Sequence, residues 1–145
     1  MHTMDDPHNL QRFLDAQASC YHEALAEICA GNKRSHWMWF IFPQIDGLGR
    51  SATARHYAIK SDEEAEAYLA HPILGARLHE CCAALLAVEG RSAHQIFGSP
   101  DDMKLKSSMT LFTVVAGQKS EFMQVLQRYY AGELDTATLE LLGGG

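Results

Sequence analysis

The sequence predicts a mainly α-helical protein, a single compact domain of about six or seven helices with one short aromatic extended segment. Three observations lead to this prediction. The 145 residues, 47% of them hydrophobic and 21% charged, suffice for one domain with a core and are too few for two. Apolar side chains recur at spacings of three and four along most of the chain. From Trp37 to Phe42 this spacing is lost, because every position is apolar.

The ends of the chain are expected to lie outside this domain. We expect a disordered leader over residues 1–8, a globular helical domain over 9–142 and a disordered tail over 143–145. The first residues, MHTMDDPHN, are polar and acidic, unlike a signal or transit peptide. No apolar run approaches the roughly 18 to 20 residues that cross a bilayer, so we expect no membrane association and a cytoplasmic location.

The first expected helix runs from Asn9 to Ala30. Its apolar face consists of residues spaced by three or four: Leu10, Phe13, Leu14, Gln17, Tyr21, Leu25 and Ile28. Asn9 is the expected N-cap, and Gly31 stands where a left-handed residue ends a helix. After the basic turn that follows, Pro43 disfavours helical geometry at Phe42 and so favours an extended segment over 37–42. A short buried helix remains open there, because six residues do not separate the two periods.

The rest of the chain is expected to be helical. Ser61 and Glu64 have the spacing of a capping box, which predicts a helix over 61–70. Further helices are expected over 72–89, 99–117, 120–131 and 135–142, with a short helix over 51–59 and a helical turn over 92–97.

Charge is distributed unevenly along the chain. The net charge of −6 argues against a general nucleic-acid binder. Residues 31–60 nevertheless hold five cations against the single acid Asp46, a local charge of +4, and 103–119 hold three lysines and no acid. These two segments either converge on one anion or form separate solvated faces.

Several kinds of catalytic site are not indicated. The eight histidines show no HExxH or paired Cys/His spacing, so no metal is expected. There is no GxSxG elbow, Walker loop or GxGxxG fingerprint, and no cofactor is expected. The four cysteines form no CxxC motif and are expected to be reduced.

The aromatic run is the first candidate site. Cations and an amide flank it, namely Lys33, Arg34 and His36 before it and Gln44 and Arg50 after it. A nucleotide-like anion needs an aromatic surface such as Trp37 for its base and positive charge for its phosphate. The GLGRS segment that ends at Ser51 either presents backbone N–H groups to an anion or is a plain turn. Alternatively, the aromatic run is part of the hydrophobic core and lines no pocket.

The helix over 99–117 carries the second candidate patch. Lys104 and Ser107 share a stripe on it, and Asp101 lies three residues before Lys104. Asp101 and Lys104 are either an i,i+3 surface pair or an acid beside a phosphate clamp. If the site catalyses a reaction, His36 and Asp101 are the candidate acid–base groups.

Six segments together resemble a known family: LQRFLDAQ, GNKRSHWMWFIFPQIDGLGRS, YAI, EAEAYLAHPILGARL, IFG and PDDMKLKSSMTLF. In this order they are similar to the bacterial domain of unknown function 1810 family, over about residues 9–140. Some members are automatically labelled "calpastatin", whose inhibitory repeats are flexible, unlike the compact domain expected here. SATARHYAIKS and KLKSSMTLF also look like an ADP-ribose-linked superfamily that cleaves N-glycosidic bonds, although Ala52 and Thr53 stand where its helix carries a glutamate.

Two functions follow from these patterns. The first is binding, with or without processing, of a nucleotide-like or ADP-ribose-like anion in an aromatic and basic pocket. The alternative is a non-enzymatic protein-interaction module, in which the aromatic run is core or a surface for a partner. The sequence leaves the ligand, any reaction and the oligomeric state open.

Overall fold

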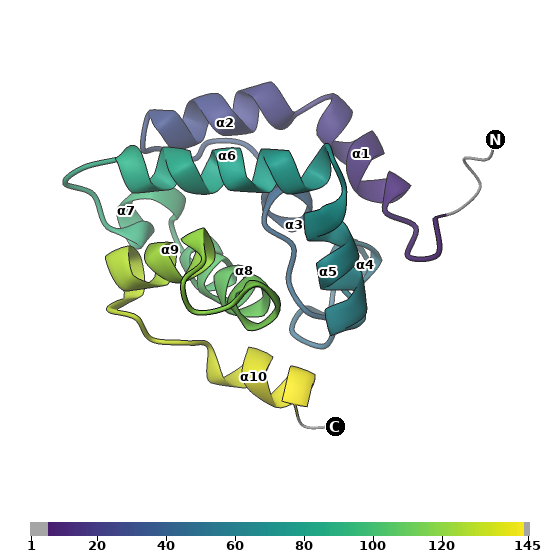
Figure 1. Cartoon of the computed structure of the whole chain (residues 1–145). Coiled ribbons are helices and arrows are strands. Elements are labelled where there is room, and N and C mark those ends of the chain that lie inside the picture. Colours follow the sequence, from purple (N-terminus) through teal and green to yellow (C-terminus); the bar gives the residue numbers. More distant parts are fainter. Residues whose placement is uncertain (1–5, 144–145) are drawn as a thin grey trace.

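Ten helices form the described part of the chain, residues 6–143, in the computed structural model (Figure 1). In chain order they are α1 (Gln11–Ala18), α2 (Tyr21–Cys29), α3 (Met38–Ile41), α4 (Ala52–His56), α5 (Asp62–Ala70), α6 (Leu74–Ala87), α7 (Ala93–Phe97), α8 (Asp101–Ala116), α9 (Glu121–Tyr130) and α10 (Thr136–Gly143). The predicted mainly helical class is confirmed. The predicted number of six or seven helices is wrong, because one expected helix is divided and the short segments are helical.

The division falls within the helix expected over 9–30. Ser19 ends α1, and Cys20, with φ near −134°, separates it from α2. The break lets α1 pack on α3 while α2 packs on α6 (Figure 1). Periodicity did not reveal it, because Gln17 and Tyr21 keep helical spacing across the break and both are buried.

The aromatic segment is also helical, so the predicted extended conformation is wrong. Met38–Ile41 form the single turn α3, closed by hydrogen bonds from Ile41 N to Trp37 O and from Phe42 N to Met38 O, both 3.1 Å. Pro43 restricts only the residue before it: Phe42 leaves the helical region, with φ −125° and ψ 77°. In the described residues the nearest feature to a sheet is one parallel bridge, between Ile45 and Ile59.

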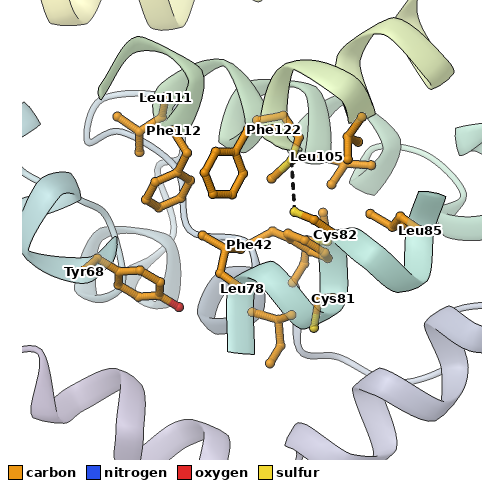
Figure 2. Packing of buried hydrophobic residues seen from close by; sticks show 14 of the residues in the cluster. Phe42, Tyr68, Leu78, Cys81, Cys82, Leu85, Leu105, Leu111, Phe112 and Phe122 are labelled. Atoms are coloured by element: carbon orange, nitrogen blue, oxygen red, sulfur yellow. Dashed lines mark hydrogen bonds between the residues drawn. The ribbon is translucent and has the colours of Figure 1, made fainter. Parts of the chain in front are cut away.

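The core is organised around α6 and α8. All residues from Leu105 to Thr113 of α8 are buried, as expected of a helix covered on every side. It packs against α5, α7, α9 and α10, while α6 packs against α2, α5 and α9. Figure 2 shows Phe112 and Phe122 facing Leu78 and Cys82, with Phe42 among them. All four cysteines are free thiols.

The start of α1 differs from the expectation. Asn9 does not cap the helix and instead has a positive φ of 51°. The Asp6 carboxylate accepts hydrogen bonds from Leu10 N at 2.8 Å and Gln11 N at 2.9 Å. Residues 1–5 and 144–145 of the expected leader and tail lie outside the described residues.

Other predicted helix ends can be compared directly. Gly31 has the left-handed conformation expected of it, with φ 70°. Ser61 Oγ accepts from Glu64 N at 3.1 Å, which confirms the serine half of the capping box. The glutamate half is wrong, because the Glu64 carboxylate bonds to Arg12 and to Lys60 N. No helix over residues 6–143 is both long enough and apolar enough to cross a bilayer.

Candidate functional site

Lysines from two distant segments meet at one carboxylate. Lys33, in the turn after α2, lies with its Nζ 2.9 Å from Asp101 Oδ2. Lys104, on the first turns of α8, lies with its Nζ 3.4 Å from Asp101 Oδ1. Their side chains are 7% and 26% exposed, and that of Asp101 is 20% exposed. Lys33 and Lys104 therefore converge, and the anion between them is a residue of the protein itself.

Each lysine also lies over a tryptophan ring. Lys33 Nζ is 4.9 Å from the centroid of Trp37, and Lys104 Nζ is 4.9 Å from that of Trp39. Such cation–π contacts stabilise a lysine in a fixed position. Trp37 is fully buried and packs against core aromatic rings, whereas Trp39 is only half-buried. Of the two, Trp39 is the one that a ligand can reach.

Glu27, which no sequence pattern singled out, holds the turn that carries Lys33. Its carboxylate accepts hydrogen bonds from Arg34 N, from Ser35 N and Oγ, and from Trp37 Nε1, at 2.6 to 2.9 Å. Burial alone would raise the pKa of Glu27, but these hydrogen bonds outweigh it and lower the pKa to about 2. The sequence did offer one signal for this role. An acid in the last turn of a helix can accept hydrogen bonds from the backbone N–H groups of the turn that follows.

The Lys33 side chain is fixed by further contacts. Its Nζ donates to Ser35 O at 2.5 Å, in addition to the ion pair with Asp101. Its backbone N donates to Ile96 O at 2.7 Å, which ties the turn to α7. Lys104 is held less tightly: among the described residues its Nζ makes one ion pair and the contact with Trp39. Lys104 therefore has donors to offer to a ligand.

A small hollow adjoins Trp39. Gln44, Gly49 and Tyr57 are among its lining residues, and its volume is about 10 Å³. This is room for about one water molecule and not for a nucleobase. Gly49 is needed here because a Cβ atom on it would lie 2.5 Å from the Cβ of Ala54. A base would therefore have to stack on the outer surface of Trp39.

The other predicted residues lie either in the turn after α2 or directly before α4. Arg34, His36, Arg50 and Ser51 are exposed. Arg34 and His36 lie in the turn held by Glu27, and Arg50 follows a residue of the hollow. Ser51 Oγ accepts from Ala54 N at 3.0 Å and so caps α4, which makes its segment the start of a short helix.

Ser107 does not take part in this site. It is buried, and its Oγ lies 3.2 Å from both Met103 O and Asp135 Oδ2. Asp135 precedes α10, so Ser107 contributes to the contact between α8 and α10. Lys104 and Ser107, which were expected to share a stripe, therefore have different neighbours. Lys104 lies beside Asp101 and Trp39, and Ser107 lies beside Asp135.

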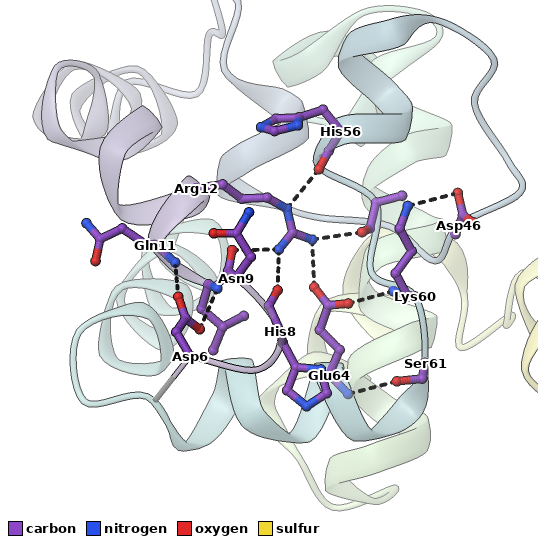
Figure 3. Close-up of polar contacts among 12 residues, drawn as sticks. Asp6, His8, Asn9, Gln11, Arg12, Asp46, His56, Lys60, Ser61 and Glu64 are labelled. Carbon is purple, nitrogen blue, oxygen red and sulfur yellow. Dashed lines mark hydrogen bonds and ion pairs between the residues drawn. The ribbon is translucent and has the colours of Figure 1, made fainter. Parts of the chain in front are cut away.

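A second polar cluster surrounds Arg12 at the start of α1 (Figure 3). The guanidinium donates to the carbonyl oxygens of four residues and to the Glu64 carboxylate, at distances from 2.6 to 2.9 Å. The four carbonyl groups belong to His8, Asn9, His56 and Ala58. All five N–H donors of Arg12 are thus used. The cluster joins α1 to the end of α4 and to α5. The partners His56, Ala58 and Glu64 are 44 to 52 residues from Arg12 in the sequence.

A metal centre is not indicated by the described residues. Within 6–143, no three His, Cys, Asp or Glu side chains are grouped so that they could hold a metal ion. The chemistry available at the Lys33–Asp101–Lys104 site is therefore that of ammonium groups, a carboxylate and an indole ring.

Comparison with known proteins identifies the family. The model of the family described as "Protein of unknown function (DUF1810)" matches residues 7–142. The chain belongs to this family. This DUF1810 protein is similar to a solved structure, the conserved hypothetical protein Rv1873 from Mycobacterium tuberculosis, with 52% sequence identity and a TM-score of 0.92. The match covers 95% of this chain and 99% of that one. No curated protein matches.

Proposed function

We propose that this DUF1810 protein binds a nucleotide-like anion at the surface formed by Lys33, Trp39, Asp101 and Lys104. The observation that supports the proposal is the convergence of two lysines from distant segments on one carboxylate. The cluster carries two positive charges and one negative charge, so its net charge is +1 in a protein of net charge −6. A local excess of positive charge attracts anions.

The two lysines have different roles in this proposal. Lys33 is almost fully buried and fixed by Ser35, Asp101 and Trp37, so it sets the position of the carboxylate and of the turn. Lys104 is partly exposed and contacts the ligand phosphate directly. An ammonium–phosphate contact is a charge-assisted hydrogen bond, about twice as strong as a neutral one.

Trp39 and the exposed polar residues complete the proposed site. The accessible part of Trp39 offers a surface for stacking a base, in the absence of a deep pocket. Gln44, which lines the hollow beside it, offers an amide for the edge of the base. Arg34 and Arg50 are exposed and carry further positive charge. If a reaction follows binding, His36 and Asp101 remain the candidate acid–base groups.

Thermal unfolding with a panel of anions tests this function. The panel contains AMP, NAD, ADP-ribose and pyrophosphate at constant ionic strength. A ligand at 100 times its Kd stabilises the fold by about 2.7 kcal/mol, which raises Tm by several degrees. We expect a base-containing ligand to raise Tm and to quench tryptophan fluorescence, because it stacks on Trp39.

Three variants decide where the ligand binds. Lys104→Gln should abolish the shift, whereas Lys119→Gln, which removes the same charge beyond the opposite end of α8, should leave it unchanged. Trp39→Phe should reduce the quenching. A shift that persists in Lys104→Gln would exclude this site, and no shift with any anion would favour the protein-interaction alternative.

A further inference from the structure

A basic groove lies beside α4 and has different lining residues from the hollow next to Trp39. Its volume is about 520 Å³, and it is lined by His8, Arg55, His56 and Lys60 around the Arg12–Glu64 pair. Figure 3 shows His8, His56 and Lys60 around this pair. Ala54 and Tyr57 line the hollow beside Trp39, whereas Arg55 and His56 line this groove. The two sites thus share an element but none of their lining residues. A volume of this size lies within the usual range of small-molecule sites.

The Arg12–Glu64 pair contributes no free N–H donor to the groove, and each Glu64 carboxylate oxygen already accepts a hydrogen bond. Arg12 uses all five N–H groups, and Glu64 accepts from Arg12 at one oxygen and from Lys60 N at the other. The carbonyl groups of His8, Asn9 and His56 also point at Arg12. Since these carbonyl oxygens would otherwise repel an anion, Arg12 makes the groove suitable for negative charge.

The remaining groove groups are cationic or able to donate. Arg55 and Lys60 carry positive charge, and His8 and His56 each carry an imidazole ring. Lys60 pairs with Asp46 at 3.5 Å, but both side chains are about half exposed, so the pair is screened by solvent. The lining holds three cations and one carboxylate, a net charge of +2, or +1 with Asp46 included.

We propose that this groove is a binding site for a phosphate group, carried by a phosphomonoester or present as inorganic phosphate. The guanidinium of Arg55 matches two phosphate oxygens at once, and Lys60, whose Nζ donates to Arg55 O at 3.1 Å, adds a point charge beside it. The imidazole rings can donate to the remaining oxygens. The proposal does not depend on the nucleotide-like ligand, because the two sites have separate lining residues.

Amide chemical shifts of the full-length ¹⁵N-labelled protein test the groove directly. The protein is titrated with inorganic phosphate and, separately, with glycerol 3-phosphate, while chloride keeps the ionic strength constant. We expect saturable shifts at the amides of Asn9, His56 and Lys60. Tighter binding of glycerol 3-phosphate than of inorganic phosphate would identify a phosphomonoester as the ligand. Equal affinities would identify the phosphate group alone.

Matched variants separate a specific site from general screening. Arg55→Gln should weaken phosphate binding by about tenfold or more, because a charge-assisted contact is lost. Lys119→Gln removes one positive charge outside the groove and should leave binding unchanged. Absence of saturable shifts, or equal weakening by both variants, would overturn the proposal. Shifts at Trp39 and Lys104 without shifts in the groove would overturn it while supporting the proposed function.

Discussion

The protein contains two ionic clusters of different kinds. The Arg12 and Glu64 side chains are 8% and 2% exposed. Every N–H donor of Arg12 and both carboxylate oxygens of Glu64 have a hydrogen-bond partner. Around Asp101, one carboxylate is shared by two lysines, of which Lys104 is partly exposed and has donors to spare. The first cluster is complete without a ligand, and the second has one positive charge more than its carboxylate neutralises.

This difference separates a structural role from a binding role. A buried ion pair that lacks one partner leaves a charge without compensation, which destabilises the fold. A partly exposed lysine is still hydrated and can exchange water for an anion at little cost. We therefore expect changes at Arg12 to alter the free energy of unfolding, and changes at Lys104 and Asp101 to alter anion affinity.

The largest effect is expected for Arg12→Met. The substitution leaves the Glu64 carboxylate and four backbone carbonyl groups without their donor, and should lower the free energy of unfolding by about 3–5 kcal/mol. Urea denaturation measures this loss. Glu64→Gln, which keeps an acceptor oxygen for Arg12, should cost less. A loss below about 1 kcal/mol for Arg12→Met would contradict the structural role of the cluster.

The same substitution at the other cluster should cost less. In Lys33→Met, Asp101 keeps its pair with Lys104 and its place at the start of α8, where a helix dipole favours an acid. We expect a loss of about 1–2 kcal/mol in urea denaturation, between the values for buried and exposed pairs. A loss equal to that of Arg12→Met would show that the two clusters are equally structural.

A smaller, pH-dependent effect is expected at Glu27. Its pKa in the folded protein, about 2, lies below the ordinary value of 4.5, so its ionised form stabilises the fold fully above pH 4.5. This stabilisation is lost as the pH falls toward 2. At pH 7, Glu27→Gln should cost about 1 kcal/mol, less than the full shift implies because the carboxylate is partly solvated.

The pH series provides its own control. The difference in unfolding free energy between the wild type and Glu27→Gln should shrink steadily from pH 5 to pH 3. If the difference stays constant over this range, the Glu27 carboxylate does not hold the turn that carries Lys33 through its charge.

The smallest effect on stability is expected for Lys104→Gln. Its pair with Asp101 is partly exposed, and such pairs contribute about 0–1 kcal/mol. Urea denaturation should give a change within about 0.5 kcal/mol, the range of surface substitutions. A loss as large as that of Lys33→Met would mean that Lys104 serves the fold.

The helical class was predictable because it depends on local spacing. Ser61, Gly31 and the start of the helix near Asp101 were found from residues within one turn of each helix end. The break at Cys20 was not found, because the apolar period continues through it. The turn at Met38–Ile41 was not found, because Pro43 acts only on Phe42.

The candidate site was predictable in part. Cations flanking the aromatic run indicated Lys33, and the helix over 99–117 indicated Lys104 and its i,i+3 pair with Asp101. The sequence did not indicate that Lys33 would lie against the same carboxylate. The partners of Arg12 and the four hydrogen bonds of Glu27 could not be predicted, because they depend on tertiary packing or on the path of a loop. Ser107 was assigned to the wrong surroundings, since helical spacing gives a stripe but not which element covers it.

The affinity of ADP-ribose for the wild type and for Asp101→Asn, measured by titration calorimetry, tests the central claim most directly. The substitution removes the internal carboxylate that competes with a ligand phosphate for Lys104. Our account predicts binding by the wild type and an affinity about tenfold higher in Asp101→Asn, a gain of about 1.4 kcal/mol. Unchanged or weaker binding in Asp101→Asn would contradict the claim that the two lysines form an anion site.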